Sequence, residues 1–203
     1  MNTTTMSYAV RFLVALAACS GILSAANLRY WIEPCTRPET TCKADDPQLA
    51  QWALEAWAKA SGGKLHLEKS ADRQHAHIRV QWASANQGLY GEARPIEVDG
   101  VQGAEVYVLP DLSGMTRDIA QATRLDGLLR DAIVYLTCLH ETGHALGLPH
   151  TGAFADIMYT FTYGGDIPEY FGRYRRLLGT RADIPKHSGI SAADQTRLMQ
   201  VVK

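Results

Sequence analysis

The sequence predicts one domain of the α/β class, in which a sheet packs against helices. Five short segments have the alternating, β-branched or aromatic composition of strands, and stretches with helical spacing of apolar residues lie between and after them. The chain of 203 residues is 46% hydrophobic, which suits a single domain with a sizeable core. The expected strands are residues 28–33, 64–69, 76–82, 89–98 and 103–109.

The fourth expected strand differs from the others because it contains Gly91 and Pro95. A proline has no N–H for the ladder, and this confines a strand to the edge of a sheet. Asp99 and Gly100 predict a turn into the last strand. An ordinary surface hairpin is the other interpretation of this segment. Residues 110–124 predict a polar connection to the next helix.

Three longer helices are expected along the chain. Asp45 or Asp46 can cap the first, which has Pro47 in its first turn and runs to about residue 60. The second begins at or near Asp126 and continues through residue 141 with its apolar residues toward the core. Ser191 opens a C-terminal helix with a sequence, S-A-A-D, that is similar to a capping box.

The first 26 residues have the features of an export signal, which leaves residues 27–203 as the domain. Arg11 is their only charge, and an apolar run and small residues follow it. Two cleavage sites compete. Residues 16–19 read L-A-A-C, similar to a bacterial lipobox, with cleavage before Cys19 and lipidation of its sulfur; ordinary signal peptidase would instead cut after Ala26. We expect either a cell-surface or outer-membrane lipoprotein, attached only through Cys19, or a secreted protein.

The other cysteines have different expected roles. Cys35 and Cys42 bracket a short loop, and two nearby cysteines in an exported protein indicate a disulfide. Cys138 lies two residues before His140, about 200° around the helix from it. We therefore expect Cys138 to be a buried free thiol that points away from any metal on His140.

Residues 140–150 read H-E-T-G-H-A-L-G-L-P-H and predict a catalytic zinc site. On a helix, His140 and His144 leave the same face one turn apart, which suits two nitrogens on one zinc ion. Glu141 can reach a metal-bound water. Gly147 lets the backbone turn sharply, and the turn returns His150 as a third ligand. Three protein ligands leave the fourth tetrahedral position to water.

This pattern, followed by Met158 in D-I-M-Y, resembles the metzincin metalloproteases and, in its closer details, the matrixin branch. Thr160 stands where the matrixin turn usually has a proline. The resemblance implies a five-stranded, mostly parallel twisted sheet with an antiparallel edge strand, and a cleft over the helix that carries the histidines. It also implies that Met158 is an apolar floor beneath the metal ligands. It is strong over residues 140–159 and weak elsewhere in residues 28–203.

The resemblance implies that the edge strand lines the cleft, where an extended peptide can add to it through main-chain hydrogen bonds. The residues expected to bind substrate are Leu89, Tyr90, Gly91, Glu92, Ala93 and Tyr159. Matrixins usually carry a second zinc and calcium ions, but their ligands are not recognisable in this sequence, so we expect one zinc ion. Cys35 as an inhibitory thiolate on the metal, as in matrixin pro-segments, is an alternative to the disulfide.

Two further features allow alternative interpretations. His75 and His77 share a face if they lie on a strand, but no other ligand type clusters with them, which favours solvated side chains over a metal site. Residues 168–178 predict a short basic helix beside the cleft, which either contacts substrate or a partner or is surface decoration.

The predicted function is zinc-dependent endopeptidase activity on a peptide or protein substrate. Glu141 takes the proton of the zinc-bound water and passes it to the leaving amine. A catalytically silent, zinc-dependent peptide-binding module at the cell surface is the alternative, and a hydrolase of non-peptide amides is a third hypothesis. The net charge of −1, without a basic run, gives no indication of nucleic-acid binding. We expect a monomer.

Overall fold

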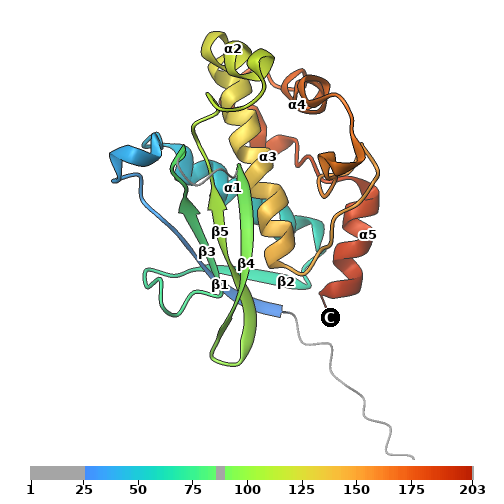
Figure 1. Ribbon diagram of the computed structural model, residues 1–203. Coiled ribbons are helices and arrows are strands. Elements are labelled where there is room, and N and C mark those ends of the chain that lie inside the picture. The colour runs from blue at the N-terminus through green and yellow to red at the C-terminus, as the bar shows by residue number, and fades with distance from the viewer. Residues whose placement is uncertain (1–25, 86–89, 203) are drawn as a thin grey trace, which may run out of the picture.

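The computed structural model of the protein describes residues 26–85 and 90–202, and these form one sheet with helices packed beside it (Figure 1). The strands are β1 (Ala26–Ile32), β2 (Leu65–Lys69), β3 (Ile78–Trp82), β4 (Gly91–Val98) and β5 (Val101–Val108). The helices are α1 (Asp46–Ala60), α2 (Arg117–Leu125), α3 (Gly127–Ala145), α4 (Ile167–Arg175) and α5 (Ala192–Val201), and the short 3-10 helices are η1 (Pro38–Thr40), η3 (Phe161–Tyr163) and η4 (Arg181–Lys186).

The sheet has the order β2-β1-β3-β5-β4 and is parallel except for β4. The predicted edge strand is confirmed: β4 pairs antiparallel with β5 and carries Pro95 within it. Asp99 and Gly100 both have positive φ, 52° and 77°, and form the tight turn between these strands. The prediction of a five-stranded, mostly parallel sheet with an antiparallel edge is therefore correct.

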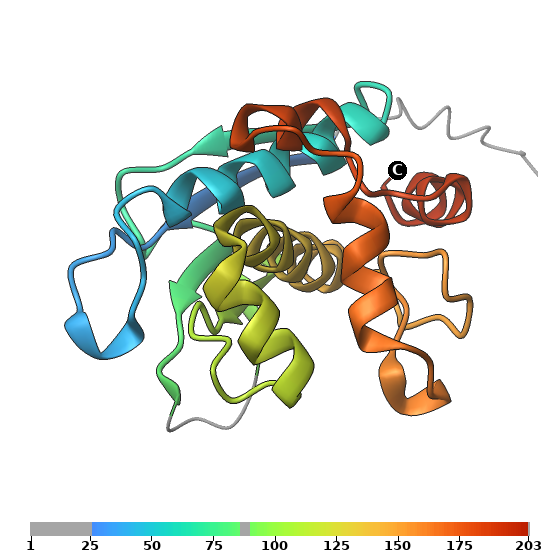
Figure 2. The ribbon, with the colours of Figure 1, turned by 90° about the horizontal axis from the view of Figure 1, so that it is seen from above.

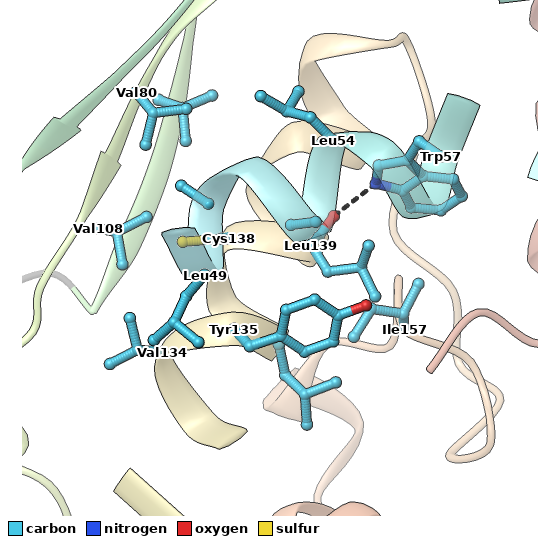
Figure 3. Close-up of a cluster of buried hydrophobic side chains, with 14 of the residues drawn as sticks. Leu49, Leu54, Trp57, Val80, Val108, Val134, Tyr135, Cys138, Leu139 and Ile157 are labelled. Carbon is cyan, nitrogen blue, oxygen red and sulfur yellow. Dashed lines mark hydrogen bonds between the residues drawn. The ribbon is translucent and has the colours of Figure 1, made fainter. Parts of the chain in front are cut away.

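One face of the sheet forms the core with α1 and α3. Side chains alternate along β3 and β5, so that Val80 and Val106 lie side by side and are fully buried, whereas the neighbouring pair of Arg79 and Glu105 is ionic. Figure 3 shows Val80 and Val108 of the sheet facing side chains of both helices. Figure 2 shows the coils of α1 and α3 lying beside each other. The opposite sheet face is polar.

Two polar contacts fix α3 against α1. The Trp57 indole N–H donates to the Leu139 carbonyl at 2.9 Å, one residue before the predicted ligand His140 (Figure 3). Near the other end of α3, the Arg130 guanidinium forms a buried ion pair with Asp46, whose carboxylate also accepts from the Lys43 backbone N–H. Asp45 occupies the N-cap position of α1, as predicted. Its side chain, however, makes no capping hydrogen bond to the backbone N–H groups of the first turn.

The termini of α3 and α5 follow the sequence closely. Asp126 caps α3 by accepting from the backbone N–H groups of Leu128 and Leu129. Ser191 and Asp194 form a complete capping box at the start of α5. Both signals are side-chain contacts within three residues of the helix start, and local signals of this kind are readable from sequence.

Two expectations about polar segments are wrong. Residues 110–124 include all of α2 except its last residue, Leu125. The sequence does not reveal this helix because only Ile119 and Ala120 of it are buried. His77 is not solvated: it is buried, and its Nδ1 accepts from the Arg29 backbone N–H at 2.9 Å. His75 is exposed beside Asp72, as expected. Neither histidine joins a group of metal-ligating side chains within the described part of the chain.

The three cysteines within the described residues are arranged as predicted. Cys35 and Cys42 form a disulfide, so Cys35 does not serve as an inhibitory thiolate. Cys138 is a buried free thiol that packs in the core with Leu49 and Val108 (Figure 3). Burial strongly raises the pKa of its thiol, which keeps it protonated and unreactive.

The predicted export signal, including Cys19, lies almost entirely outside the described residues, as does Leu89. The last residue of that predicted signal, Ala26, is the first residue of β1 and pairs with Leu65. Across residues 26–85 and 90–202, none of the helices combines the length and apolarity that a membrane crossing requires.

Candidate active site

The C-terminal end of α3 turns sharply and brings three histidines together. Gly147 has φ of 92°, a left-handed conformation that glycine adopts without steric cost. Its backbone N–H donates to the His144 carbonyl, and the Leu148 N–H donates to the Gly143 carbonyl at 3.0 Å, which ends the helix. The chain then reverses, and His150 returns beside His140 and His144 as predicted.

The three imidazoles converge through their Nε2 atoms. The His150 Nε2 lies 3.1 Å from that of His140 and 3.0 Å from that of His144. The Nδ1 atoms point the other way: that of His140 lies 2.7 Å from the Ile157 carbonyl, and that of His144 lies 2.8 Å from the Leu148 carbonyl. Because a carbonyl only accepts, both Nδ1 atoms carry a proton and donate it, so both Nε2 atoms are left with a lone pair.

This donor set fits a zinc ion. If His150 Nε2 carries a proton, it can donate that proton to the Nε2 of either His140 or His144, but not to both. The Nε2 lone pair of the remaining histidine then faces no hydrogen-bond donor from this cluster. Nitrogens at 2.0–2.1 Å from a tetrahedral zinc lie about 3.3 Å from one another, close to the spacing of these atoms. Burial lowers the pKa of His140 to about 4 and also lowers that of His144, so both rings are neutral at neutral pH, as ligands must be.

Glu141 lies between this cluster and the edge strand. Its side chain is buried, and burial, with a smaller contribution from the charge of Glu92, raises the pKa of its carboxyl to about 7. The backbone of Gly91 on β4 packs directly against it: a Cβ at Gly91 would lie 2.8 Å from the Glu141 carboxyl carbon. A larger residue at position 91 would therefore displace the carboxylate.

Met158 is completely buried and packs against α3, the helix that carries His140 and His144. The helix approaches it closely at Gly143, where an added Cβ would lie 3.3 Å from the methionine Cε and 3.0 Å from Trp57. The sulfur is nearer still to that position. Met158 therefore packs against α3 at Gly143, which lies between His140 and His144 in the sequence, and its role as an apolar floor beneath the metal ligands stays a prediction.

The segment that carries Met158 is fixed on both sides. Thr151, next to His150, forms a parallel bridge with Tyr159, in which its N–H donates to the Met158 carbonyl at 2.8 Å. Asp156 accepts from the side chains of Ser191 and Arg197 of the C-terminal region, as well as from Thr151. Burial opposes ionisation of Asp156, but these hydrogen bonds outweigh it and lower the pKa of the carboxyl.

A cavity of about 670 Å³ opens beside the histidines. It reaches His140, Glu141 and His150 at one end, and the rest of its lining is mainly apolar. The lining comes from α3, from the turn after Met158, from the connection around α2 and from α4; its apolar members include Met115, Leu136, Ile157, Phe161, Ile167 and Phe171. This composition suits a bulky apolar group next to the polar cluster.

The residues expected to bind substrate divide into two sets. Tyr90, Gly91 and Tyr159 line the cavity, whereas Glu92 and Ala93 do not. The Glu92 carboxylate pairs with Arg94, and Ala93 faces a separate hollow near the end of α3.

The sequence did not reveal the apolar walls of the cavity. Thr160, the residue before η3, and Phe161 both line the cavity, so this wall is present without the proline that the matrixin turn usually has. The sequence signal that could have revealed this apolar wall is the group of aromatic residues within residues 168–178, the segment predicted to be a basic helix or surface decoration. That helix, α4, lies beside the cleft as expected, and Tyr170 and Phe171 face the cavity.

Comparison with known proteins gives two findings. A family model described as matrixin matches residues 23–168. The hatching enzyme of Paracentrotus lividus is 25% identical over 145 residues, which is 71% of this chain and 23% of the enzyme. The chain thus spans about a quarter of that relative's length.

Proposed function

Because the chain belongs to the matrixin family of zinc metallopeptidases, we propose that it is an endopeptidase with one zinc ion on His140, His144 and His150 and with Glu141 as general base. The observation that supports this most strongly is the convergence of the three Nε2 atoms, with Nδ1 protons held on backbone carbonyls in two of the rings. Zinc in such a site polarises the scissile carbonyl and lowers the pKa of water to about 7.

Glu141 moves the proton in this proposal. Its carboxylate accepts a proton from the attacking water and then delivers it to the leaving amine. Burial raises the pKa of Glu141 to about 7 in the protein without metal, and a nearby cation lowers it. The opposing effects keep the carboxyl able both to accept and to release a proton near neutral pH. Gly91 has no side chain, and this leaves room for the Glu141 carboxylate beside the edge strand.

The proposed substrate is an extended peptide. The exposed edge of β4 can pair with it through main-chain hydrogen bonds, next to Tyr90 and Gly91. A side chain adjacent to the scissile bond then enters the cavity, whose apolar lining favours a large hydrophobic residue there. The alternative, a silent peptide-binding module, has no use for a buried carboxyl at Glu141.

A chelator-sensitive cleavage assay tests the function. The purified domain is incubated with an unfolded protein and with quenched fluorescent peptides, before and after removal of metal, and again after zinc is restored. We expect cleavage that disappears with the metal and returns with zinc. Binding of the peptide with zinc present, but without cleavage, would support the silent module, and cleavage of non-peptide amides alone would support the third hypothesis.

Metal analysis tests the number of zinc ions. We propose one per chain, because the described residues offer one group of three histidines; the other group of metal-ligating residue types contains the bridged Cys35 and Cys42 with Asp46, which pairs with Arg130. Two tightly bound zinc ions per chain would contradict this.

Export is also part of the proposal, and the disulfide is consistent with an oxidising compartment. Lipidation at Cys19 and cleavage after Ala26 remain the two routes. Intact mass and the mature N-terminus of the protein from its native host distinguish them. Under the lipoprotein route, Cys19→Ala releases the protein from the membrane fraction.

A further inference from the structure

The peptide group between Asp156 and Ile157 is held at both of its polar atoms. The Tyr170 hydroxyl of α4 donates to the Asp156 carbonyl at 2.9 Å. The Ile157 N–H donates to the Asp194 carboxylate of α5 at 2.7 Å. One buried peptide plane is therefore clamped between two helices, and its rotation is restricted from both sides.

This peptide group lies immediately before the carbonyl that orients His140. The Ile157 carbonyl accepts from His140 Nδ1 at 2.7 Å, and the same Tyr170 hydroxyl reaches that carbonyl at 3.3 Å. Rotation of the clamped peptide would move the Ile157 carbonyl. The imidazole that donates to it would then turn its Nε2 away from those of the other two histidines.

We propose that Tyr170 is a positioning residue for the metal site: its hydroxyl fixes the Asp156–Ile157 peptide and thereby the ring orientation and tautomer of His140. The inference rests on the proposed function only in taking His140 as a zinc ligand. Partners of this kind, one step beyond the ligands, commonly change metal affinity or activity by about 10–100-fold when removed.

The surroundings of Tyr170 are suited to this role. The side chain is only 4% exposed, and its ring is enclosed by those of Phe154, Phe161 and Phe171, with centroids 5.1–5.4 Å away. The Arg173 guanidinium stacks on the Tyr170 ring at 4.4 Å and donates to the Phe154 carbonyl. The hydroxyl therefore has a fixed position. Tyr170 also lies beyond residue 168, where the match to the family model ends.

Tyr170→Phe tests the proposal because it keeps the ring and removes the hydroxyl. Tyr174→Phe is the matched control: Tyr174 lies on the same helix, is equally buried, and donates to the carbonyls of Ile184 and His187, away from Met158. The zinc dissociation constant of each metal-free protein is measured by competition with a chelator. The visible spectrum of each cobalt-substituted protein reports the ligand geometry. Thermal unfolding of the metal-free proteins checks that both remain folded.

We expect Tyr170→Phe to bind zinc about 10–100-fold more weakly, with an altered cobalt spectrum and a lower kcat at nearly unchanged KM. Tyr174→Phe should match wild type in zinc affinity and spectrum. Wild-type affinity and spectrum in Tyr170→Phe, or equal changes in both variants, would overturn the proposal. If wild type binds zinc but cuts no peptide, the proposed function fails while the affinity comparison still decides the role of Tyr170.

Discussion

Two neighbouring regions build the proposed metal site in different ways. The ligand segment, residues 140–150, contains all three histidines and Glu141, and it acquires its shape from one helix and one glycine turn. The cover segment, residues 151–175, supplies no histidine. It nevertheless contains the Ile157 carbonyl that His140 contacts, Met158 packed against Gly143 of α3, and the aromatic wall of the cavity. In the proposed function, the ligand segment supplies the chemistry, and the cover segment fixes its geometry and selects the side chain that enters the cavity.

The comparison predicts that changes in the ligand segment abolish function, whereas changes in the cover segment weaken it. His144→Ala deletes a ligand, so we expect loss of zinc and a fall of activity to background. His75→Ala is the control, because this exposed histidine lies outside the cluster. Zinc content is measured together with turnover. Retention of zinc and activity by His144→Ala would remove it from the ligand set.

Gly143 is where the two regions meet, and its substitution tests whether the fit between them matters. Gly143→Ala forces Met158 or Trp57 to shift, which we expect to cost about 1–3 kcal/mol of stability. A displacement of about 1 Å at the ligands would lower kcat/KM by roughly 100-fold. Gly127→Ala is the matched control on the same helix, since nothing lies within 4 Å of its Cβ position. Denaturant unfolding and kinetics measure both effects.

Phe161 tests the selecting role of the cover segment. Phe161→Ala removes part of the cavity wall, so a peptide with a bulky apolar side chain should lose about tenfold in kcat/KM, and one with a small side chain should lose less. Tyr163→Ala in the same 3-10 helix is the control, because Tyr163 is 70% exposed and does not line the cavity. Equal losses on both peptides would contradict a role in selection.

The smallest expected effect concerns Asp156, whose hydrogen bonds hold the cover segment to the C-terminal region. Its substitution should change the free energy of unfolding but not the activity. The hydrogen bonds that lower the Asp156 pKa stabilise the fold above the ordinary aspartate value of about 4, and this stabilisation is lost as pH falls through the lowered folded value. Asp156→Asn should lose about 1–2 kcal/mol at pH 7 and show a weaker acid dependence than wild type. Urea unfolding between pH 7 and pH 3 measures this. The exposed Asp118→Asn should leave the wild-type pH dependence unchanged.

The same contrast explains what was predictable from sequence. The ligand segment was predictable because the histidine spacing and the glycine turn act within a few residues of each other, and the start of α3 was predictable because the Asp126 cap acts on the next three residues. The strands were predictable because their inward residues alternate. The fold was therefore readable to within a few residues in most elements.

The missed features depend on contacts between distant segments. The wall of the cavity forms only when the residues just before α2 and those of α4 pack beside α3. Tyr170 acquires its role only because its hydroxyl meets a carbonyl 14 residues earlier in the chain. His77 is buried beside β1, where its Nδ1 accepts from the Arg29 backbone N–H, 48 residues away in the chain. Short-range sequence patterns cannot predict these contacts, because the residues that make them are far apart in the chain.

Glu141→Ala gives the most direct test of the central claim, that the histidines hold zinc while Glu141 moves the proton. Glu141 is not a ligand, so the variant should fold and bind one zinc ion with wild-type affinity. Its turnover of a peptide that wild type cuts should fall by about 10²–10⁴-fold, the usual contribution of a general base. A zinc-loaded Glu141→Ala protein that keeps most of the wild-type turnover would contradict the proposed mechanism.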